Sequence, residues 1–132
     1  MMRAVLADTG PLYAALDPED GYHKRALQEL QMLDRDRRQI VVLYSTLLEA
    51  HSLIMFRLGR DVASEWLTEM ANAALLNPVP EDYREAAARI RSLSDQPITL
   101  VDAVAAVIAT RLQVEVWTYD HHFDVMRVPV WR

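Results

Sequence analysis

Four acidic residues stand at positions from which a folded chain could bind a metal ion. Asp8 ends one short apolar run and Asp120 closely follows another, whereas Glu49 and Asp102 each lie three residues after a threonine. If these four side chains meet, they cannot all remain ionised without a cation. Oxygen ligands in a chain without cysteine favour Mg²⁺ or Mn²⁺ over Zn²⁺.

The two threonine-spaced acids have a second interpretation. Thr46 with Glu49, and Thr99 with Asp102, fit a capping box, in which the acid binds the backbone at the start of its own helix. Taken alone, either pair is better explained as a cap. In a parallel sheet, however, a helix that follows a strand begins near the carboxyl edge, and this would bring Glu49 to the rim where Asp8 lies. No strong strand precedes Asp102, so its position depends on helix packing.

Several neighbouring polar residues have open roles. Thr118 could bind a ligand carboxylate or simply end a strand, and Asp124, four residues after Asp120, could reach the same metal or face water. His121 and His122 are expected at or near the surface rather than as zinc ligands. The remaining acids are expected to be solvated surface charges, namely Asp17, Asp20, Asp34, Asp36 and most glutamates.

Hydrophobic periodicity predicts an alternation of strands and helices. Apolar runs bounded by polar or turn residues predict strands at 4–8, 40–44, 75–80 (at a sheet edge) and 114–118, with a last short one at 128–130. Helical spacing of apolar residues predicts helices at 12–16, 22–33, 45–58, 61–73 (capped by Asp61), 81–93 and 99–112. Strands separated by helices indicate an α/β fold with right-handed crossovers and a mainly parallel sheet.

Composition limits the class of protein. The 132 residues, 52% of them hydrophobic, suit one domain over residues 1–132, and no apolar stretch is long enough to predict a signal peptide or a membrane span. The absence of cysteine suits a reducing, intracellular setting. A net charge of -5 argues against binding nucleic acid mainly through counterion release, although it leaves room for an acidic pocket neutralised by metal.

With these residues in view, the sequence resembles the PIN-domain ribonucleases, and among them the VapC-type toxins of toxin–antitoxin pairs. Four motifs carry the resemblance over nearly the whole chain: Asp8-Thr9 after the first strand, Glu49 in the third helix, the run 100–103 (Leu-Val-Asp-Ala), and the run 117–123 (Trp-Thr-Tyr-Asp-His-His-Phe). Two positions depart from the family pattern. Gly10 stands where Ser or Asn is frequent, and Gln113 stands where Gly often precedes the fourth strand.

The resemblance implies a three-layer α/β/α sandwich and metal-dependent endonucleolytic cleavage of RNA in the cytoplasm. It assigns the catalytic acids as Asp8, Glu49, Asp102 and Asp120. Asp8, Asp102 and Asp120 would bind one or two Mg²⁺ or Mn²⁺ ions, Glu49 would act directly or through water, and Thr9 and Thr118 would support them. A cognate antitoxin and a homodimer are also implied, and the apolar residues that could form these surfaces, unless they are core, are Leu12, Tyr13, Leu53, Met55 and Phe56. Guanidinium groups suit RNA phosphates, and the arginines that could bind them, or could simply be solvated, are Arg35, Arg37, Arg38, Arg57 and Arg60.

Other classes share fragments of these motifs. Asp8-Thr9-Gly10 is also the signature of aspartic proteases, which are all-β, and Asp120-His121-His122 occurs in a phosphoesterase family of much larger chains. A phosphoryl-accepting regulator would need a lysine opposite the acids, but the single lysine, Lys24, falls early in a helix. The remaining alternatives are a PIN-fold RNA-processing nuclease without an antitoxin and a non-catalytic binding module of the same fold.

Overall fold

A computed structural model describes residues 3–132 of the chain. Its strands are β1 (Ala4–Ala7), β2 (Gln39–Leu43), β3 (Ala74–Leu76) and β4 (Glu115–Trp117). Its helices are α1 (Thr9–Ala14), α2 (His23–Arg35), α3 (Tyr44–Leu58), α4 (Arg60–Met70), α5 (Pro80–Ser92), α6 (Leu100–Leu112) and α7 (His122–Val125). None of these helices is long and apolar enough to cross a lipid bilayer.

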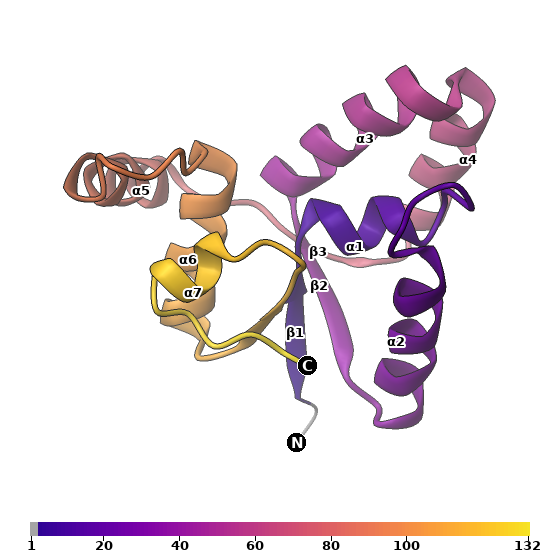
Figure 1. Ribbon diagram of the computed structural model, residues 1–132, viewed down its shortest axis with the longest axis horizontal. Helices are drawn as coiled ribbons and strands as arrows, with labels where there is room; N and C mark the ends of the chain where they lie inside the picture. Colours follow the sequence, from indigo (N-terminus) through magenta and orange to yellow (C-terminus); the bar gives the residue numbers. More distant parts are fainter. Residues whose placement is uncertain (1–2) are drawn as a thin grey trace.

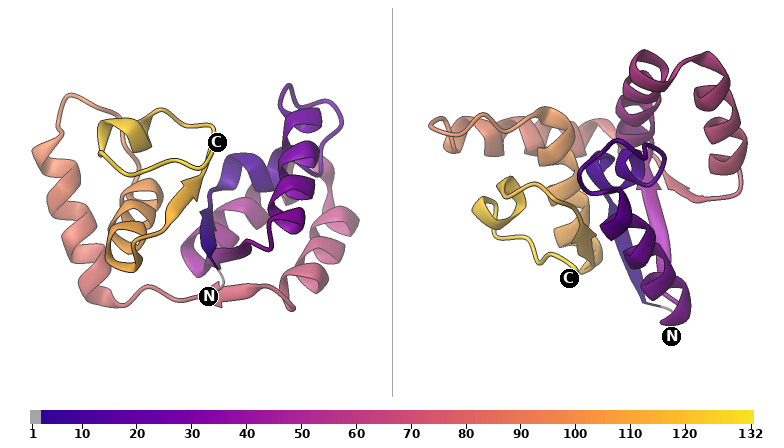
Figure 2. Two further views of the ribbon diagram at one scale, coloured as in Figure 1. Left: turned by 90° about the horizontal axis from the view of Figure 1, so that it is seen from below. Right: turned by 45° about the vertical axis from the view of Figure 1, so that its right-hand side comes forward.

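The strands form one four-stranded sheet in the order β3-β2-β1-β4, and every pairing is parallel. The chain therefore moves outward from β1 to β2 and β3, then returns to place β4 on the other side of β1. Figure 2 shows β3 at the sheet edge, where the chain passes from one helical layer to the other. The α/β fold with a parallel central sheet is confirmed, including the edge position of the third strand.

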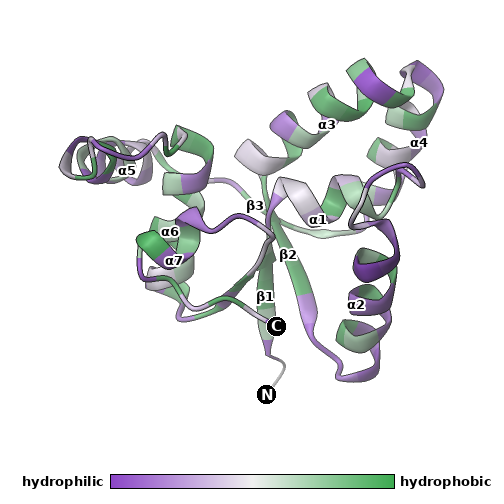
Figure 3. Ribbon diagram, viewed as in Figure 1, coloured by the Kyte–Doolittle hydropathy of each residue, from purple (hydrophilic) through white to green (hydrophobic). Residues whose placement is uncertain are grey.

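Two hydrophobic cores cover opposite faces of the sheet, as the uninterrupted apolar runs of the strands require. Val5 and Trp117 face one core, with α1 to α4, whereas Leu6 and Val116, their neighbours along the strands, face the other, with α5 to α7. Figure 1 shows the two helical layers on either side of the strands. Figure 3 shows that β1 and β2 are hydrophobic along most of their length, as strands covered on both faces should be. With one helical layer on each face of the sheet, the fold is a three-layer α/β/α sandwich.

The boundaries differ from the predicted ones mainly at helix starts. Helix α3 begins at Tyr44, so Thr46 is a fully buried residue inside the helix and not its cap. Gly59, with a φ of 94°, is the N-cap of α4 in place of Asp61, which lies in the first turn. Thr99 does cap α6, and its Oγ1 accepts a hydrogen bond from the Asp102 N–H at 3.2 Å.

The end of the chain also differs from the prediction. The expected strand at 128–130 is reduced to one parallel bridge between Val116 and Val130. The short helix α7 (His122–Val125) precedes this bridge and begins two residues after Asp120. A helix of one turn has too few residues to show apolar periodicity, so this pattern could not predict α7.

Candidate active site

The topology of the sheet places a crevice beside the ends of β1 and β4. In open parallel sheets, ligands bind outside the carboxyl ends of the strands, where the direction of winding reverses. Here the reversal lies between β1 and β4, because β2 and β4 flank β1 on opposite sides. Asp8 directly follows β1, and Asp120 follows β4 after two residues. Both acids therefore stand at the position where this class of sheet binds ligands.

Helix direction brings the other two acids to the same edge. Helix α3 starts directly after β2, so Glu49 lies in its second turn, close to the carboxyl edge. Helix α6 leads into β4 through Gln113, so its end lies at the amino edge and its start lies at the carboxyl edge. Its 13 residues span about 20 Å at 1.5 Å per residue. This length carries Asp102 back to the rim, which the sequence could not settle.

The four carboxylates line a single open cleft of about 450 Å³. The other lining residues are Thr9, Gly10, Thr99, Tyr119 and His121. This lining, within the part of the chain that the structure describes, contains no lysine or arginine. The negative charge gathered here is therefore not offset by a lysine or arginine within the cleft lining itself.

Asp8 is held by the neighbouring strand end. Its Oδ2 accepts a hydrogen bond from Thr118 Oγ1 at 2.8 Å, and the same Oγ1 accepts from the Asp120 N–H at 2.9 Å. The Asp8 N–H donates to the Trp117 carbonyl at 2.9 Å, which continues the β1–β4 ladder. Thr118 therefore fixes the spacing between two of the four acids.

Glu49 is held in a similar way by the start of α1. Thr9 Oγ1 donates to Glu49 Oε1 at 2.6 Å, joining residues 40 positions apart. The Glu49 side chain therefore bonds across the cleft, and the capping-box interpretation is wrong for this acid. At Asp102, only the backbone half of a capping box is present, and the carboxylate lines the cleft.

Burial and mutual repulsion raise the pKa values of two of these acids. Desolvation raises the pKa of Asp8 from 3.8 to about 6, aided by the charges of Asp120 and Glu49 and opposed by the Thr118 hydrogen bond. Desolvation, followed by the charges of Asp8, Asp120 and Glu49, raises the pKa of Asp102 to about 7. The site is thus unfavourable for four free carboxylates, and a bound divalent cation would relieve it.

The donor set fits a hard divalent metal. Four carboxylates with several oxygens directed into one cleft match the oxygen ligands of Mg²⁺ and Mn²⁺. Asp120, His121 and His122 also have ligand atoms within 4.8 Å of one another. However, the His121 side chain is 75% exposed, and the Asp120 Oδ1 already accepts the His122 backbone N–H at 2.9 Å. Asp120 thus belongs to both candidate ligand sets, the four carboxylates of the cleft and the Asp120-His121-His122 group.

Some residues considered from the sequence lie elsewhere. Asp124 is exposed, pairs with Arg132 at 3.3 Å and does not line the cleft. Arg35 and Arg37 are exposed at the end of α2, next to the amino end of β2, and Arg38 there pairs with Glu115 at 2.9 Å. These three arginines are thus at the edge of the sheet opposite the acids.

Two other arginines lie on the cleft side. Arg57 and Arg60 are exposed around the α3–α4 junction, and the Arg57 guanidinium is 5.3 Å from the ring centre of Tyr13 in α1. Arg57 shares α3 with Glu49 of the cleft, whereas Arg60 begins α4, none of whose residues lines the cleft.

The sequence did not identify two buried acids. Glu29 is 8% exposed and accepts hydrogen bonds from Tyr119 Oη at 2.6 Å and Trp117 Nε1 at 3.1 Å. Asp82 is 2% exposed, accepts the Val79 N–H at 2.8 Å and pairs with Arg111 of α6. These two acids are exceptions to the expectation that most remaining acids are solvated. Glu29 receives its hydrogen bonds from distant residues, whereas Asp82 has one distant partner, Arg111, and one local partner, the Val79 N–H. For Asp82, the sequence Val-Pro-Glu-Asp at a helix start is a capping signal that could have been used.

Comparison with known protein families identifies the class. The sequence profile of the PIN domain family matches residues 5–129. The chain therefore belongs to the PIN domain family, which is a family of nucleases. Among curated protein sequences, none matches this chain significantly.

Solved structures share the whole fold at low sequence identity. VapC20 of Mycobacterium tuberculosis, described as a toxin that cleaves the sarcin–ricin loop, has a TM-score of 0.85 at 15% identity, covering 97% of this chain and 98% of the other. VapBC2 of Rickettsia felis, bound to a DNA fragment from its promoter, has a TM-score of 0.74 at 12% identity, covering 98% and 97%. FitAcB of Neisseria gonorrhoeae has a TM-score of 0.67 at 17% identity, covering 97% and 96%.

Proposed function

We propose that this protein is a metal-dependent endoribonuclease that cleaves RNA by attack of water on a phosphodiester. The observation that supports this most directly is the meeting of Asp8, Glu49, Asp102 and Asp120 in one cleft without a basic lining residue. Membership of the PIN domain family supports the same activity.

In this proposal, Asp8, Asp102 and Asp120 hold one or two Mg²⁺ or Mn²⁺ ions, and Glu49 acts directly or through a water molecule. A divalent ion held by these residues would polarise the phosphate and lower the pKa of the attacking water. Thr118 and Thr9 keep the Asp8 and Glu49 carboxylates oriented through their hydrogen bonds. Departure of the 3′-oxygen leaves a 5′-phosphate on the downstream fragment.

The cellular role that we propose is that of the toxin in a toxin–antitoxin pair. Its support is the fold shared with VapC20, with VapBC2 and with FitAcB. The alternatives are a PIN-fold RNA-processing nuclease without an antitoxin and a non-catalytic binding module. Retention of all four carboxylates favours the enzyme over the binding module.

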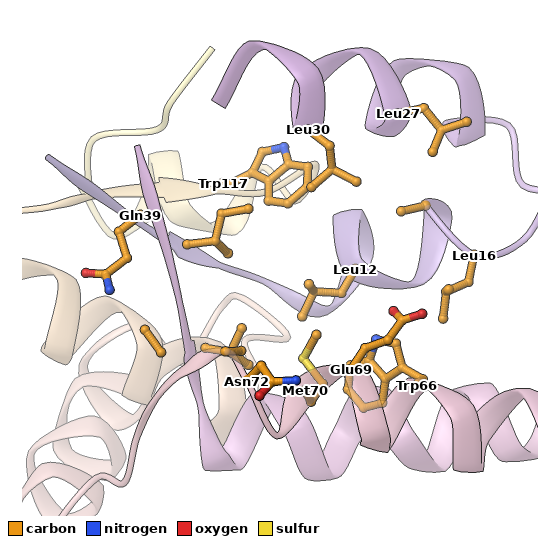
Figure 4. Close-up of a pocket in the computed structure, with 15 residues that line it drawn as sticks. Leu12, Leu16, Leu27, Leu30, Gln39, Trp66, Glu69, Met70, Asn72 and Trp117 are labelled. Atoms are coloured by element: carbon orange, nitrogen blue, oxygen red, sulfur yellow. The ribbon is translucent and has the colours of Figure 1, made fainter. Parts of the chain in front are cut away.

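An apolar groove gives a place for an antitoxin segment. It has a volume of about 540 Å³ and lies among α1, α2, α4 and β2, as Figure 4 shows. Its labelled lining includes Leu12, Leu16, Leu27 and Trp66, and Leu27 is 42% exposed. An apolar hollow of this size leaves its lining side chains without packing partners. We assign it to the apolar face of an antitoxin segment, which would pack against the early helices and extend from there to block the acidic cleft.

Helix α3 carries a second apolar surface that suits a homodimer. Its exposed side includes Leu48 (65% exposed), Met55 (41%) and Phe56 (87%), together with Tyr44 at its start. Because this stripe is uncharged, two copies related by a two-fold axis could pack it against itself without opposing like charges. By contrast, Tyr13 is packed in the core, and Leu12, which is also largely buried, has its remaining exposed surface in the apolar groove.

The arginines divide by position in this proposal. Arg57, on the helix that carries Glu49, and Arg60, at the start of the next helix, are the better candidates for contact with RNA phosphates. Arg35, Arg37 and Arg38 would contact only RNA that extends around to the amino edge of the sheet.

A cleavage assay on a structured RNA tests the activity. Wild-type protein with Mg²⁺ or Mn²⁺ should produce defined fragments with 5′-phosphate ends, and EDTA or the Asp8→Asn substitution should abolish cleavage. Asp36→Asn, the same change at an exposed acid of the opposite edge, is the matched control and should cleave normally. Fragments ending in cyclic phosphate, or cleavage that survives both EDTA and Asp8→Asn, would contradict the proposal.

A further inference from the structure

A second hollow, of about 220 Å³, adjoins the acidic cleft. Three residues, Tyr119, Asp120 and His121, line both the cleft and this hollow. Arg25 and Arg132 line the hollow but not the cleft, together with Asp124, which pairs with Arg132 at 3.3 Å. A polyanion bound with one phosphate in the cleft would therefore meet the Arg25 guanidinium at this adjoining hollow.

Tyr119 and Arg25, which line this hollow, form an aromatic shelf together with the adjacent Tyr22. The rings of Tyr22 and Tyr119 are stacked, with 4.5 Å between their centres and an interplanar angle of 22°. The Arg25 guanidinium is 4.6 Å from the centre of the Tyr119 ring and 5.8 Å from that of Tyr22. We call these three residues the aromatic shelf.

Two of the three shelf residues, Tyr119 and Arg25, are hydrogen-bonded to the buried carboxylate of Glu29. This residue accepts a hydrogen bond from Tyr119 Oη at 2.6 Å and one from Arg25 Nε at 3.4 Å. The Tyr22 backbone is held separately, because its N–H donates to Asp20 Oδ1 at 2.8 Å. A platform whose side chains are already ordered loses little conformational entropy when a ligand binds.

The outer parts of the shelf remain open to solvent. Tyr22 is 47% exposed, and the Arg25 side chain is 48% exposed. The hydrogen bond from Arg25 to Glu29 uses Nε, so the terminal nitrogens of the guanidinium remain for a phosphate. Exposed aromatic rings beside arginine are the features on which unpaired nucleic-acid bases stack.

We propose that the aromatic shelf binds an unpaired nucleotide next to the scissile phosphate of an RNA substrate. Its base stacks on Tyr22, and its phosphate pairs with Arg25. This subsite rests on the proposed nuclease function, and it requires one unpaired nucleotide beside the cleavage position, because a base inside a duplex is not free to stack on a protein ring.

Binding and cleavage of a labelled single-stranded oligoribonucleotide test the subsite. Binding is measured by fluorescence anisotropy with Mg²⁺ in an Asp8→Asn background, which separates binding from cleavage, and kcat and KM are measured in proteins that keep Asp8. Tyr22→Ala and Arg25→Ala should each weaken binding and raise KM about tenfold, with kcat at saturating RNA within about twofold of wild type.

Three controls separate stacking and a local contact from general charge or misfolding. Tyr22→Phe keeps the ring and should bind like wild type. Arg35→Ala removes an exposed arginine from the same helix at the opposite edge and should have little effect. A fully paired RNA duplex should bind wild type and Tyr22→Ala with equal affinity. A thermal unfolding temperature equal to that of wild type would show that each variant is folded.

The outcomes distinguish the subsite from the parent proposal. If Tyr22→Ala and Arg25→Ala bind and cleave single-stranded RNA like wild type, while Asp8→Asn abolishes cleavage, the subsite is wrong and the nuclease stands. Equal losses in Tyr22→Phe and Tyr22→Ala would also overturn stacking. If the wild type cleaves no RNA with any divalent metal, the nuclease proposal fails first.

Discussion

The Thr118 hydroxyl binds the Asp8 carboxylate at 2.8 Å although the two residues are 110 positions apart in the chain. The bond joins the ends of the two strands that flank the crevice, and the same hydroxyl accepts the Asp120 N–H at 2.9 Å. One threonine therefore sets both the orientation of Asp8 and its separation from Asp120.

Replacing this threonine should change how the site depends on pH. The hydrogen bond from Thr118 lowers the pKa of Asp8, which burial otherwise raises to about 6. In Thr118→Val the Asp8 pKa should rise further, so protons compete with the metal up to a higher pH. We expect Mn²⁺ binding at pH 7 to weaken about tenfold and to recover largely at high pH. Calorimetric titration of Mn²⁺ across pH measures this.

Thr110→Val is the matched control for this variant. The Thr110 hydroxyl also makes a hydrogen bond, to the Ala106 carbonyl at 2.9 Å, but near the far end of α6. It should leave metal binding and its pH dependence unchanged. If Thr118→Val binds Mn²⁺ with the wild-type pH profile, the hydrogen bond does not tune Asp8.

The metal-free protein should lose stability as the pH rises. Asp8 and Asp102 have pKa values of about 6 and about 7 in the fold, above the value of 3.8 for a free side chain. A raised pKa means that the folded state binds the proton more tightly than the unfolded state. The resulting stabilisation is complete below about pH 4 and disappears as the pH rises through 6 and 7.

Asp102→Asn isolates this effect. In EDTA at pH 8 the variant should be more stable than wild type by about 2 kcal/mol, and the difference should shrink toward pH 5.5. With saturating Mg²⁺ the wild type should become the more stable protein, because only the wild type keeps the Asp102 carboxylate as a metal ligand. Denaturant unfolding with and without metal provides the free energies. A variant no more stable than wild type at pH 8 in EDTA would refute the account of charge repulsion.

Gln113 offers a stability test away from the cleft. It is the C-cap of α6, with φ 56° and ψ 46°. This left-handed backbone conformation is destabilising for any residue with a Cβ atom, but not for glycine. Gln113→Gly should therefore stabilise the protein by about 1 kcal/mol. Thermal unfolding measures the gain, and the Gln113→Ala variant, which keeps a Cβ, should show none. Equal stability of both variants would mean that the backbone strain at this turn is negligible.

The sequence revealed the fold through its apolar runs and the site through the ends of those runs. Asp8 could be placed because the chain itself connects it to a strand. Glu49 and Asp102 could be placed only by assuming that their helices begin at the carboxyl edge. For Asp102 the missing information was the direction of α6, which is fixed by the strand that follows it and not by one that precedes it.

The contacts that escaped the sequence are those between distant residues. Glu29 resembles any exposed helical glutamate until folding brings Trp117 and Tyr119 to it, 88 and 90 positions along the chain. Its spacing within α2 carries no sign of these partners. The aromatic shelf was invisible for the same reason, because Tyr22 and Tyr119 meet only when α2 packs beside the end of β4.

The apolar groove makes the antitoxin proposal testable without knowledge of the cleavage site. Leu27 lines the groove and is 42% exposed, so a charged side chain there should not unfold the protein. Leu27→Glu would place an unpaired charge against the apolar face of a bound segment, at a cost of about 2 kcal/mol or more. We therefore expect binding of the product of the adjacent upstream reading frame to weaken at least tenfold.

Leu112→Glu, at a leucine 46% exposed near the opposite edge, should bind like wild type. Calorimetry with both variants measures the difference, and equal affinities would place the antitoxin on another surface.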